Sequence, residues 1–295
     1  MTVPGLSSVD AHQHFWRVER GDYAWMTPQV GVLYQDYGPS DLAPMLARHR
    51  IARTILVQAA ETEAETAYLL DVAATTPFVA GVVGWIDMTA PDAADAAARA
   101  ASNRLLVGVR PMVQDIADDD WLVRADVSAA AHGIGRSGLV FDALVFPRHL
   151  SRVLVFLDRH PHLPVVIDHG AKPFIKAGIL DPWRADIAAI GARPTTTCKV
   201  SGLVTEAGDD WTGADLRPYV EHLLDVFGPS RLMWGSDWPV VERARGYDAW
   251  RHAAVELFDG LSRDEQSAIF GGTAARVYLG TRGRRLEPTS SGPQP

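Results

Sequence analysis

The sequence predicts an α/β protein in which eight parallel strands close into a (β/α)8 TIM-type barrel, built as a single domain. Strand-like apolar runs and helix-like runs alternate from residue 9 to residue 280, with no hairpin signature between them. Such alternation is typical of a parallel sheet covered by helices. The 295 residues are close to the size of one barrel, about 250 residues plus insertions. No Gly-x-Gly-x-x-Gly turn follows a strand, which favours the barrel over a doubly wound open sheet.

The first expected strand, residues 9–16, carries a pair of histidines. His12 and His14 are two positions apart, so they project from the same side of an extended strand. Two converging imidazoles suit a metal ion or a polarised carbonyl. Asp10 shares their parity and is expected to orient one of them. The alternative is a strand whose histidines are satisfied by backbone groups or water.

Residues 17–39 have no clear period and are long for a loop. Aromatic side chains, among them Tyr23 and Trp25, stand between glycines and prolines, and this content argues against disorder. We interpret the segment as a lid or pocket wall. A surface loop whose aromatics are buried for stability is the alternative.

Local signals place the elements that follow. Ser40 is expected to cap a helix over 41–50, before a strand at 54–59. Thr62 and Glu65 form a capping box for a helix that reaches residue 75. The acidic run 118–120 suits the start of a helix that ends near residue 131. The other expected strands are 80–88, 105–112, 138–145, 164–169, 195–201 and 231–238, and the other helices are 91–102, 147–160, 182–191, 215–227, 247–258 and 263–278. 

The barrel domain is expected over residues 1–280. The tail 281–295 is rich in Arg, Ser, Gly and Pro and lacks the apolar residues needed for packing. We therefore predict that the tail is disordered.

Composition narrows the partners. With 36 acidic against 28 basic residues, the net charge of −8 offers no field for nucleic acid or an anionic membrane surface. No stretch approaches the ~18 apolar residues of a membrane helix, and the N-terminus has neither a basic patch nor an apolar run. A single cysteine, Cys198, excludes an internal disulfide and a thiolate cluster and fits a reducing compartment, so a cytoplasmic location is expected. The sequence does not indicate an oligomeric state.

Ionisable residues gather where a barrel builds its site, at the carboxyl ends of the strands. His12 and His14 end the first strand, Arg110 lies near the end of the fourth, His169 ends the sixth and Asp237 ends the eighth. Buried unpaired charges at these positions would cost several kcal/mol without a function. We therefore predict an active site made of these residues.

Several motifs also resemble a known family. Asp10-x-His12-x-His14, His169 on the sixth strand and Gly235-Ser236-Asp237-Trp238-Pro239 resemble the amidohydrolase superfamily, in its amidohydrolase-2 branch. Phrases from about residue 9 to residue 280 resemble its sugar-lactone lactonases, which act on compounds such as L-fuconolactone and L-rhamnonolactone. They include Gly108-Val109-Arg110, Asp168-His169-Gly170-Ala171-Lys172-Pro173 and Lys199-Val200-Ser201-Gly202.

The resemblance implies a hydrolase that opens a sugar-acid lactone with water activated by Asp237. It also implies no required metal or at most one divalent ion such as zinc, held by His12, His14 and Asp237 with or without His169. Binuclear members carry a bridging Lys or Glu on strand four and a His on strand five, where this chain has Arg110 and Asp142. A binuclear centre is therefore not expected. 

Each supporting residue has two readings. Arg110 is expected to bind substrate hydroxyls, or else to pair with Asp142. Lys172 and Lys199 are candidates for substrate contact or for pairing with acids. The remaining candidates are tryptophans, which either wall the pocket against a sugar ring or pack in the core: Trp16, Trp25, Trp85 and Trp238.

The chemistry implied is hydrolysis of a small, neutral, polyhydroxylated ring, with Asp237 as base and His169 and the strand-one histidines stabilising the oxyanion. Two other functions stay open. One is a mononuclear metal-dependent decarboxylase or amide hydrolase on the same scaffold, and the other is a non-catalytic sugar-binding protein.

Overall fold

A computed structural model describes residues 8–280 of the chain. Its single sheet has eight parallel strands, each hydrogen-bonded to the next along the chain. They are β1 (Ser8–Gln13), β2 (Ile51–Val57), β3 (Val79–Gly84), β4 (Leu106–Val109), β5 (Val140–Ala143), β6 (Val165–Ile167), β7 (Thr196–Val200) and β8 (Leu232–Trp234). Gln13 forms a parallel bridge with Trp238, so the chain just beyond β8 returns to β1. The predicted barrel is confirmed, and the predicted disordered tail lies outside the described residues.

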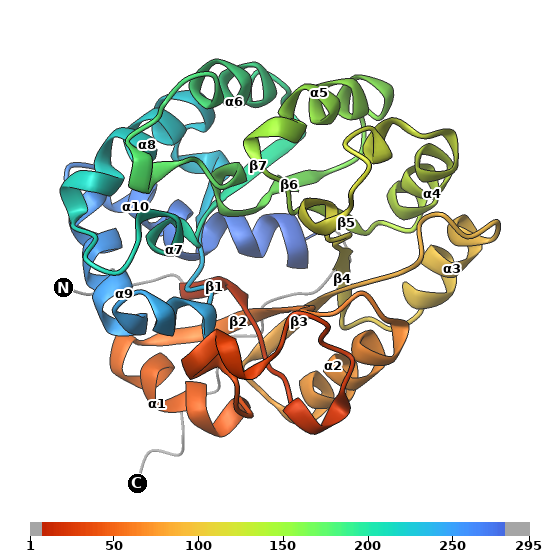
Figure 1. Cartoon of the computed structure of the whole chain (residues 1–295), viewed down its shortest axis with the longest axis horizontal. Coiled ribbons are helices and arrows are strands. Elements are labelled where there is room, and N and C mark those ends of the chain that lie inside the picture. Colours follow the sequence, from red (N-terminus) through yellow and green to blue (C-terminus); the bar gives the residue numbers. More distant parts are fainter. Residues whose placement is uncertain (1–7, 281–295) are drawn as a thin grey trace, which may run out of the picture.

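Helices surround the strands on the outside of the ring (Figure 1). They are α1 (Pro39–His49), α2 (Glu63–Thr75), α3 (Ala93–Ala100), α4 (Ala125–Arg136), α5 (Leu150–Arg159), α6 (Trp183–Gly191), α7 (Leu203–Ala207), α8 (Gly213–Phe227), α9 (Gly246–Leu257) and α10 (Arg263–Ser267). Within the described residues, no helix is long and apolar enough to cross a membrane. The strands end earlier than predicted, because the last residues of each expected strand turn into the loops that build the site.

The predicted cap of α1 and the predicted start of α4 are both wrong. The N-cap of α1 is Gly38 and not Ser40, because Pro39 sets the first turn and the Asp41 carboxylate accepts the Gly38 N–H at 2.8 Å. The helix α4 begins only at Ala125, after a 3₁₀ turn. The acidic run 118–120 therefore lies ahead of α4. Asp119 pairs with Arg148, just before α5, and Asp120 pairs with Arg152 in α5.

At the start of α2, only one of the two hydrogen bonds of the predicted capping box is present. The Thr62 hydroxyl accepts the N–H of Glu65 at 3.0 Å, as a cap does. The Glu65 carboxylate does not return to Thr62. It is buried and accepts the N–H groups of Ala59 and Ala60 at 3.0 and 2.7 Å, so it fastens the loop after β2.

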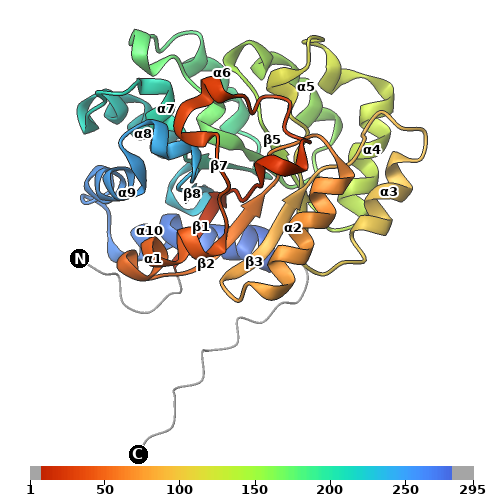
Figure 2. The same ribbon diagram turned by 60° about the horizontal axis from the view of Figure 1, so that its bottom comes forward.

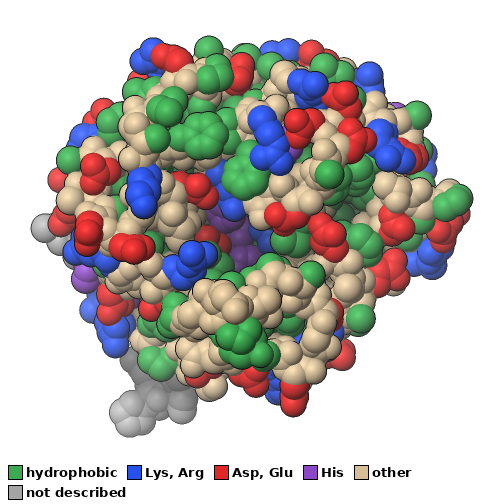
Figure 3. Space-filling model, in the orientation of Figure 1, with side chains coloured by type: hydrophobic (Ala, Val, Ile, Leu, Met, Phe, Trp, Pro, Cys, Tyr) green, Lys and Arg blue, Asp and Glu red, His purple; other side chains and the backbone are tan. Residues whose placement is uncertain are grey.

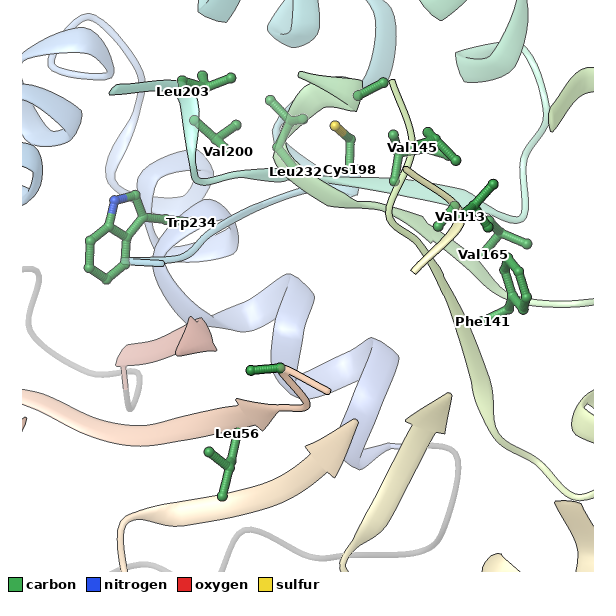
Figure 4. Packing of buried hydrophobic residues seen from close by; sticks show 14 of the residues in the cluster. Leu56, Val113, Phe141, Val145, Val165, Cys198, Val200, Leu203, Leu232 and Trp234 are labelled. Atoms are coloured by element: carbon green, nitrogen blue, oxygen red, sulfur yellow. The ribbon is translucent and has the colours of Figure 1, made fainter. Parts of the chain in front are cut away.

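The larger of two hydrophobic clusters fills the space between strands and helices. Figure 4 shows Leu56, Phe141 and Trp234 from this cluster pointing away from the middle of the ring. The helical pattern predicted over 263–278 continues after α10 as π-helical turns, 268–272 and 275–279.

A smaller cluster lies inside the barrel. It joins strand residues such as Ile55, Val166 and Met233 to Val277 and Tyr278 from the last helical segment. Figure 2 shows this blue segment beneath the strands, at the opposite end from the red segment that follows β1. The C-terminal segment therefore fills the end of the barrel that lies away from the strands' carboxyl ends.

Candidate active site

The site lies in a hollow at the carboxyl ends of the strands. Figure 3 shows histidine side chains at the bottom of this hollow, which opens on the face seen in Figure 1. The cavity measures about 250 Å³. Seven of the predicted site residues line it, namely His14, Trp16, Trp25, Arg110, His169, Lys172 and Asp237.

Two backbone hydrogen bonds bring the two ends of the barrel together at the site. The Asp237 N–H donates to the His12 carbonyl at 2.8 Å, and the His14 N–H donates to the Trp238 carbonyl at 2.7 Å. Residues that are more than 220 positions apart in the sequence thus share one small cluster. The predicted convergence of strand one and strand eight is present in the structure.

Three imidazoles surround the Asp237 carboxylate. Its Oδ1 lies 3.4 Å from His14 Nε2, 3.6 Å from His12 Nε2 and 4.0 Å from His169 Nε2. The two strand-one histidines face each other, with 3.2 Å between their Nε2 atoms. All four side chains are buried or nearly so, which strengthens electrostatic interactions among them.

Each outer imidazole is fixed by a partner behind it. His14 Nδ1 lies 2.8 Å from the Val57 carbonyl, which can only accept, so Nδ1 carries a hydrogen and Nε2 faces the site. His169 Nδ1 lies 2.9 Å from the Ser201 hydroxyl. Next to it, a Cβ on Gly202 would come within 2.5 Å of His169 Nδ1, and Gly202 also has φ of +63°. Only glycine allows this close approach.

The predicted role of Asp10 is wrong in detail. Its carboxylate does not contact an imidazole. It accepts the backbone N–H groups of His12 and Ser236 at 3.2 and 2.8 Å and the hydroxyl of Tyr247 at 3.2 Å. The pairing of β1 with β2 shifts register between Asp10 and Gln13, so simple alternation does not hold along this strand. Asp10 holds the backbone of the site in place.

Two site residues have left-handed backbones. His169 has φ of +55° and Asp237 has φ of +59°. Non-glycine residues adopt this region at a cost of about 1–2 kcal/mol, and such conformations cluster at functional sites. His169 follows the end of β6 and Asp237 follows the end of β8.

A buried charge network lies directly below the histidines. Lys199 Nζ lies 2.6 Å from Asp142 Oδ2 and 3.0 Å from Asp168 Oδ1. Arg110 pairs with Asp168 at 3.2 Å and not with Asp142, which was the predicted alternative. Arg110 also donates to the Gln58 carbonyl and lies 3.3 Å from His12 Nε2. Of the two readings for Lys199, the structure supports pairing with acids.

The protonation states follow from burial and charge. Burial and the nearby Lys199 ammonium hold the pKa of His12 well below its ordinary value. Burial lowers the pKa of His169 to about 4. Burial alone would raise the pKa of Asp237, but the surrounding histidines, His169 first, outweigh it and hold that pKa below the ordinary value. At neutral pH the ionised Asp237 carboxylate therefore faces the neutral imidazoles of His12 and His169.

Two predicted wall residues lie away from the cavity. Trp238 is buried and packs edge-on against Phe15 and Tyr37. The backbone of Trp85 is held by the Thr66 hydroxyl, and neither tryptophan lines the cavity. Trp16 and Trp25 do line it and stack edge-on, with ring centroids 5.2 Å apart. The segment 17–39 thus supplies one wall of the pocket, as its aromatic content indicates.

Three polar residues of the cavity wall were not predicted from the sequence. They are Gln114 and Asp115, after β4, and Arg243, which follows the Gly-Ser-Asp-Trp-Pro motif. The first two stand in a loop without a recognisable motif. Arg243 lies four residues beyond the motif, and this short distance in the sequence could have identified it as a residue of the site.

The donor atoms suit one divalent ion. One ligand atom each from His12, His169 and Asp237 lie within 4.8 Å of one another, with His14 adjacent. A tetrahedral zinc ion with bonds of about 2.0–2.2 Å spaces its ligand atoms roughly 3.3 Å apart. The separations of 3.2 to 4.0 Å around Asp237 and His12 are close to this spacing. The residues therefore fit a single metal ion of the zinc type.

Comparison with known proteins identifies the class. A family model described as amidohydrolase matches residues 9–279, and the chain belongs to this family. Two curated relatives are named L-fucono-1,5-lactonase. The protein from Burkholderia ambifaria is 44% identical over 92% of this chain and 94% of its own length. The protein from Burkholderia multivorans is 41% identical over 93% and 96%.

A solved structure agrees with these relatives. The crystal structure of an amidohydrolase from Burkholderia multivorans with bound zinc is 40% identical to this chain and superposes with a TM-score of 0.86. The match covers 92% of this chain and 99% of that one. Fold, cluster and relatives together place the protein among the amidohydrolases.

Proposed function

We propose that the protein is a lactonase that hydrolyses a neutral sugar-acid lactone, such as L-fuconolactone or L-rhamnonolactone. The observation that carries the proposal is the ionised Asp237 carboxylate, which stands at the bottom of a cavity between neutral imidazoles and the Arg110 guanidinium. The relatives named L-fucono-1,5-lactonase support the same substrate class.

The residues of this chain suit each step of lactone opening. Asp237 accepts a proton from a water molecule as that water attacks the carbonyl carbon. The negative charge that develops on the carbonyl oxygen is stabilised by Arg110, which is always protonated, and by His169. The C–O bond of the ring then breaks, and Asp237 returns the proton to the leaving ring oxygen. The product is an open-chain hydroxy acid.

A metal ion has a defined place in this proposal. A divalent ion such as zinc would be held by His12, His169 and Asp237 beside His14, and when bound it supplies Lewis-acid polarisation of the carbonyl. The related crystal structure that holds zinc supports the choice of a divalent ion of this type. The roles of Asp237 as base and Arg110 as a charged donor are the same in either state of the site.

The cavity walls favour a neutral substrate. Three cations line the cavity, and two already face carboxylates: Arg110 pairs with Asp168 at 3.2 Å, and Lys172 lies 4.0 Å from Glu206. A dicarboxylate would call for clustered free arginines. The opposite wall is apolar and aromatic, with Trp16, Trp25, Val30 and Leu33. A ring with hydroxyl groups and a methyl group suits these surroundings.

A lactone screen tests the proposal. Lactone opening produces an acid and releases a proton that an indicator dye records, whereas decarboxylation does not acidify the solution, and a sugar-binding protein gives no turnover. We expect turnover of six-carbon deoxy-aldonolactones and much weaker turnover of aromatic-derived dicarboxylate pyrone lactones. A preference for the dicarboxylate by tenfold in kcat/KM, about 1.4 kcal/mol in transition-state binding, would overturn the substrate class.

We further propose a cytoplasmic location, supported by the single cysteine. Cys198 is buried and free, and burial raises the pKa of its thiol, which makes it unreactive. Cell fractionation with an antibody to the protein is the test, and recovery in the periplasmic or secreted fraction would contradict it.

A further inference from the structure

An arginine without a partner stands at the mouth of the cavity. Arg243 lines the cavity and is exposed. Among residues 8–280, no carboxylate lies within 4.0 Å of its guanidinium, and its side chain forms no hydrogen bond. The other two cations of the cavity, Arg110 and Lys172, face carboxylates at 3.2 and 4.0 Å. Arg243 therefore keeps its N–H donors free, and the steps of lactone opening give it no role.

The backbone of Arg243 is tied to the proposed base. Arg243 ends the 3₁₀ turn Val240–Arg243, which directly follows the Gly-Ser-Asp-Trp-Pro motif. The Val241 N–H donates to the Asp237 carbonyl at 2.9 Å. The turn also packs against the segment Pro28–Leu33, which supplies part of the apolar wall. The backbone that carries the Arg243 side chain is thus held in place relative to Asp237.

The charged neighbours of Arg243 have structural partners. Glu242 Oε1 accepts the Tyr247 N–H at 3.3 Å, so this carboxylate faces the start of α9. The Arg245 guanidinium lies over the Trp211 ring, 5.1 Å from its centroid, and donates to the Trp211 carbonyl at 2.8 Å. Of the charged residues in the stretch 240–245, Arg243 is the one left for a bound molecule.

The size of the cavity brings a substrate close to Arg243. Its volume of about 250 Å³ is below the roughly 300–1,000 Å³ of most ligand sites. A lactone whose carbonyl carbon stands at Asp237, at the bottom, therefore has its opposite edge against the residues nearer the mouth. In a six-membered aldonolactone this edge carries neighbouring hydroxyl groups.

A guanidinium suits such an edge. Its N–H groups form a planar fork that can donate to two neighbouring oxygen atoms at once. We propose that Arg243 is a specificity-determining residue that donates hydrogen bonds to the lactone hydroxyls on the edge opposite the carbonyl, an inference that rests on the proposed lactonase function. These bonds favour a hydroxylated lactone over a bare one, because only the hydroxylated ring offers acceptors to the charged donor.

Selectivity between a hydroxylated and a bare lactone is the first test. For the full-length protein, kcat/KM is measured with L-fuconolactone and with δ-valerolactone, a six-membered lactone without hydroxyl groups. We expect Arg243→Met to lower the ratio of the two values at least about tenfold, through a higher KM for L-fuconolactone. An unchanged ratio would overturn the proposal and show that Arg243 is only a solvated surface arginine.

Arg104→Met is the matched control. Arg104 is also exposed and, within the described residues, has no ion pair, but it lies just ahead of β4, away from the cavity. The selectivity of this variant should equal that of the wild type. A fall as large as that of Arg243→Met would contradict a specific contact between Arg243 and the substrate.

A binding measurement does not depend on turnover. The lactam of L-fuconic acid keeps the ring hydroxyls and the carbonyl but has an amide in place of the ester, so it resists hydrolysis. In calorimetry, Arg243→Met should bind this lactam at least about tenfold more weakly than the wild type, and equal affinity would overturn the proposal. A wild type that opens no lactone would overturn the proposed function, whereas wild-type turnover with unchanged selectivity in Arg243→Met would overturn this inference alone.

Discussion

His169 shows how much the site depends on a neutral side chain in a buried place. Its ring is almost fully buried, and burial lowers its pKa from 6.5 to about 4. In the unfolded chain the same group takes up a proton near its ordinary pKa. Between pH 6.5 and pH 4 the unfolded chain therefore binds a proton at His169 that the folded chain does not bind. The free energy of unfolding is highest above pH 6.5 and decreases as the pH falls toward 4.

This pH dependence is a prediction for His169→Gln. The wild type should lose up to about 3 kcal/mol relative to the variant between pH 6.5 and pH 4, since one pKa unit corresponds to about 1.4 kcal/mol. Urea unfolding of both proteins at several pH values measures the difference. A difference that stays constant over this range would show that His169 is protonated in the folded site.

At the scale of the element, helix caps give a matched pair of substitutions. Thr62 caps α2 through its hydroxyl. Ser40, in contrast, lies inside the first turn of α1, and the N-cap of that helix is Gly38. Thr62→Ala should destabilise the protein by about 1 kcal/mol. Ser40→Ala should stay within about 0.5 kcal/mol of the wild type. Thermal unfolding of the two variants side by side decides it, and equal losses would contradict the assignment of the caps.

Some features of these elements can be predicted from the sequence, and others cannot. Strand and helix order, and the placement of His12, His169 and Asp237 at strand ends, follow from period and from barrel geometry. The local exceptions do not, because tertiary contacts decide them. Glu65 has the spacing of a capping box but is drawn to the N–H groups of Ala59 and Ala60. A register shift in β1 turns Asp10 toward backbone groups rather than an imidazole.

At the scale of the whole molecule, closure of the barrel determines contacts that the sequence periodicity does not predict. Lys199 meets His12 across the interior of the ring, 187 positions away in the sequence. Tyr278 reaches Asp142 only because the C-terminal segment enters the barrel. The pattern in the sequence places each residue on its own element. Their contacts depend on how eight units close around one axis.

Stability at this scale comes from the two hydrophobic clusters and not from an ion at the cavity. Dialysis against a chelator should therefore leave the protein folded. Calorimetry of the dialysed and zinc-loaded protein is the measurement. Cooperative unfolding on chelation would mean that the ion is structural, and the reading of the histidine cluster as an active site would be wrong.

The most direct test of the account is the turnover of Asp237→Asn on a six-carbon deoxy-aldonolactone. The amide keeps the shape of the side chain but cannot take a proton from water, and a general base contributes about 10²- to 10⁴-fold. Asp115→Asn, which changes another carboxylate of the same cavity, serves as the control and should stay far closer to the wild type. We predict that kcat of Asp237→Asn falls by at least about 10²-fold while its unfolding temperature matches that of the wild type. Near-wild-type turnover by a folded Asp237→Asn protein would contradict the account.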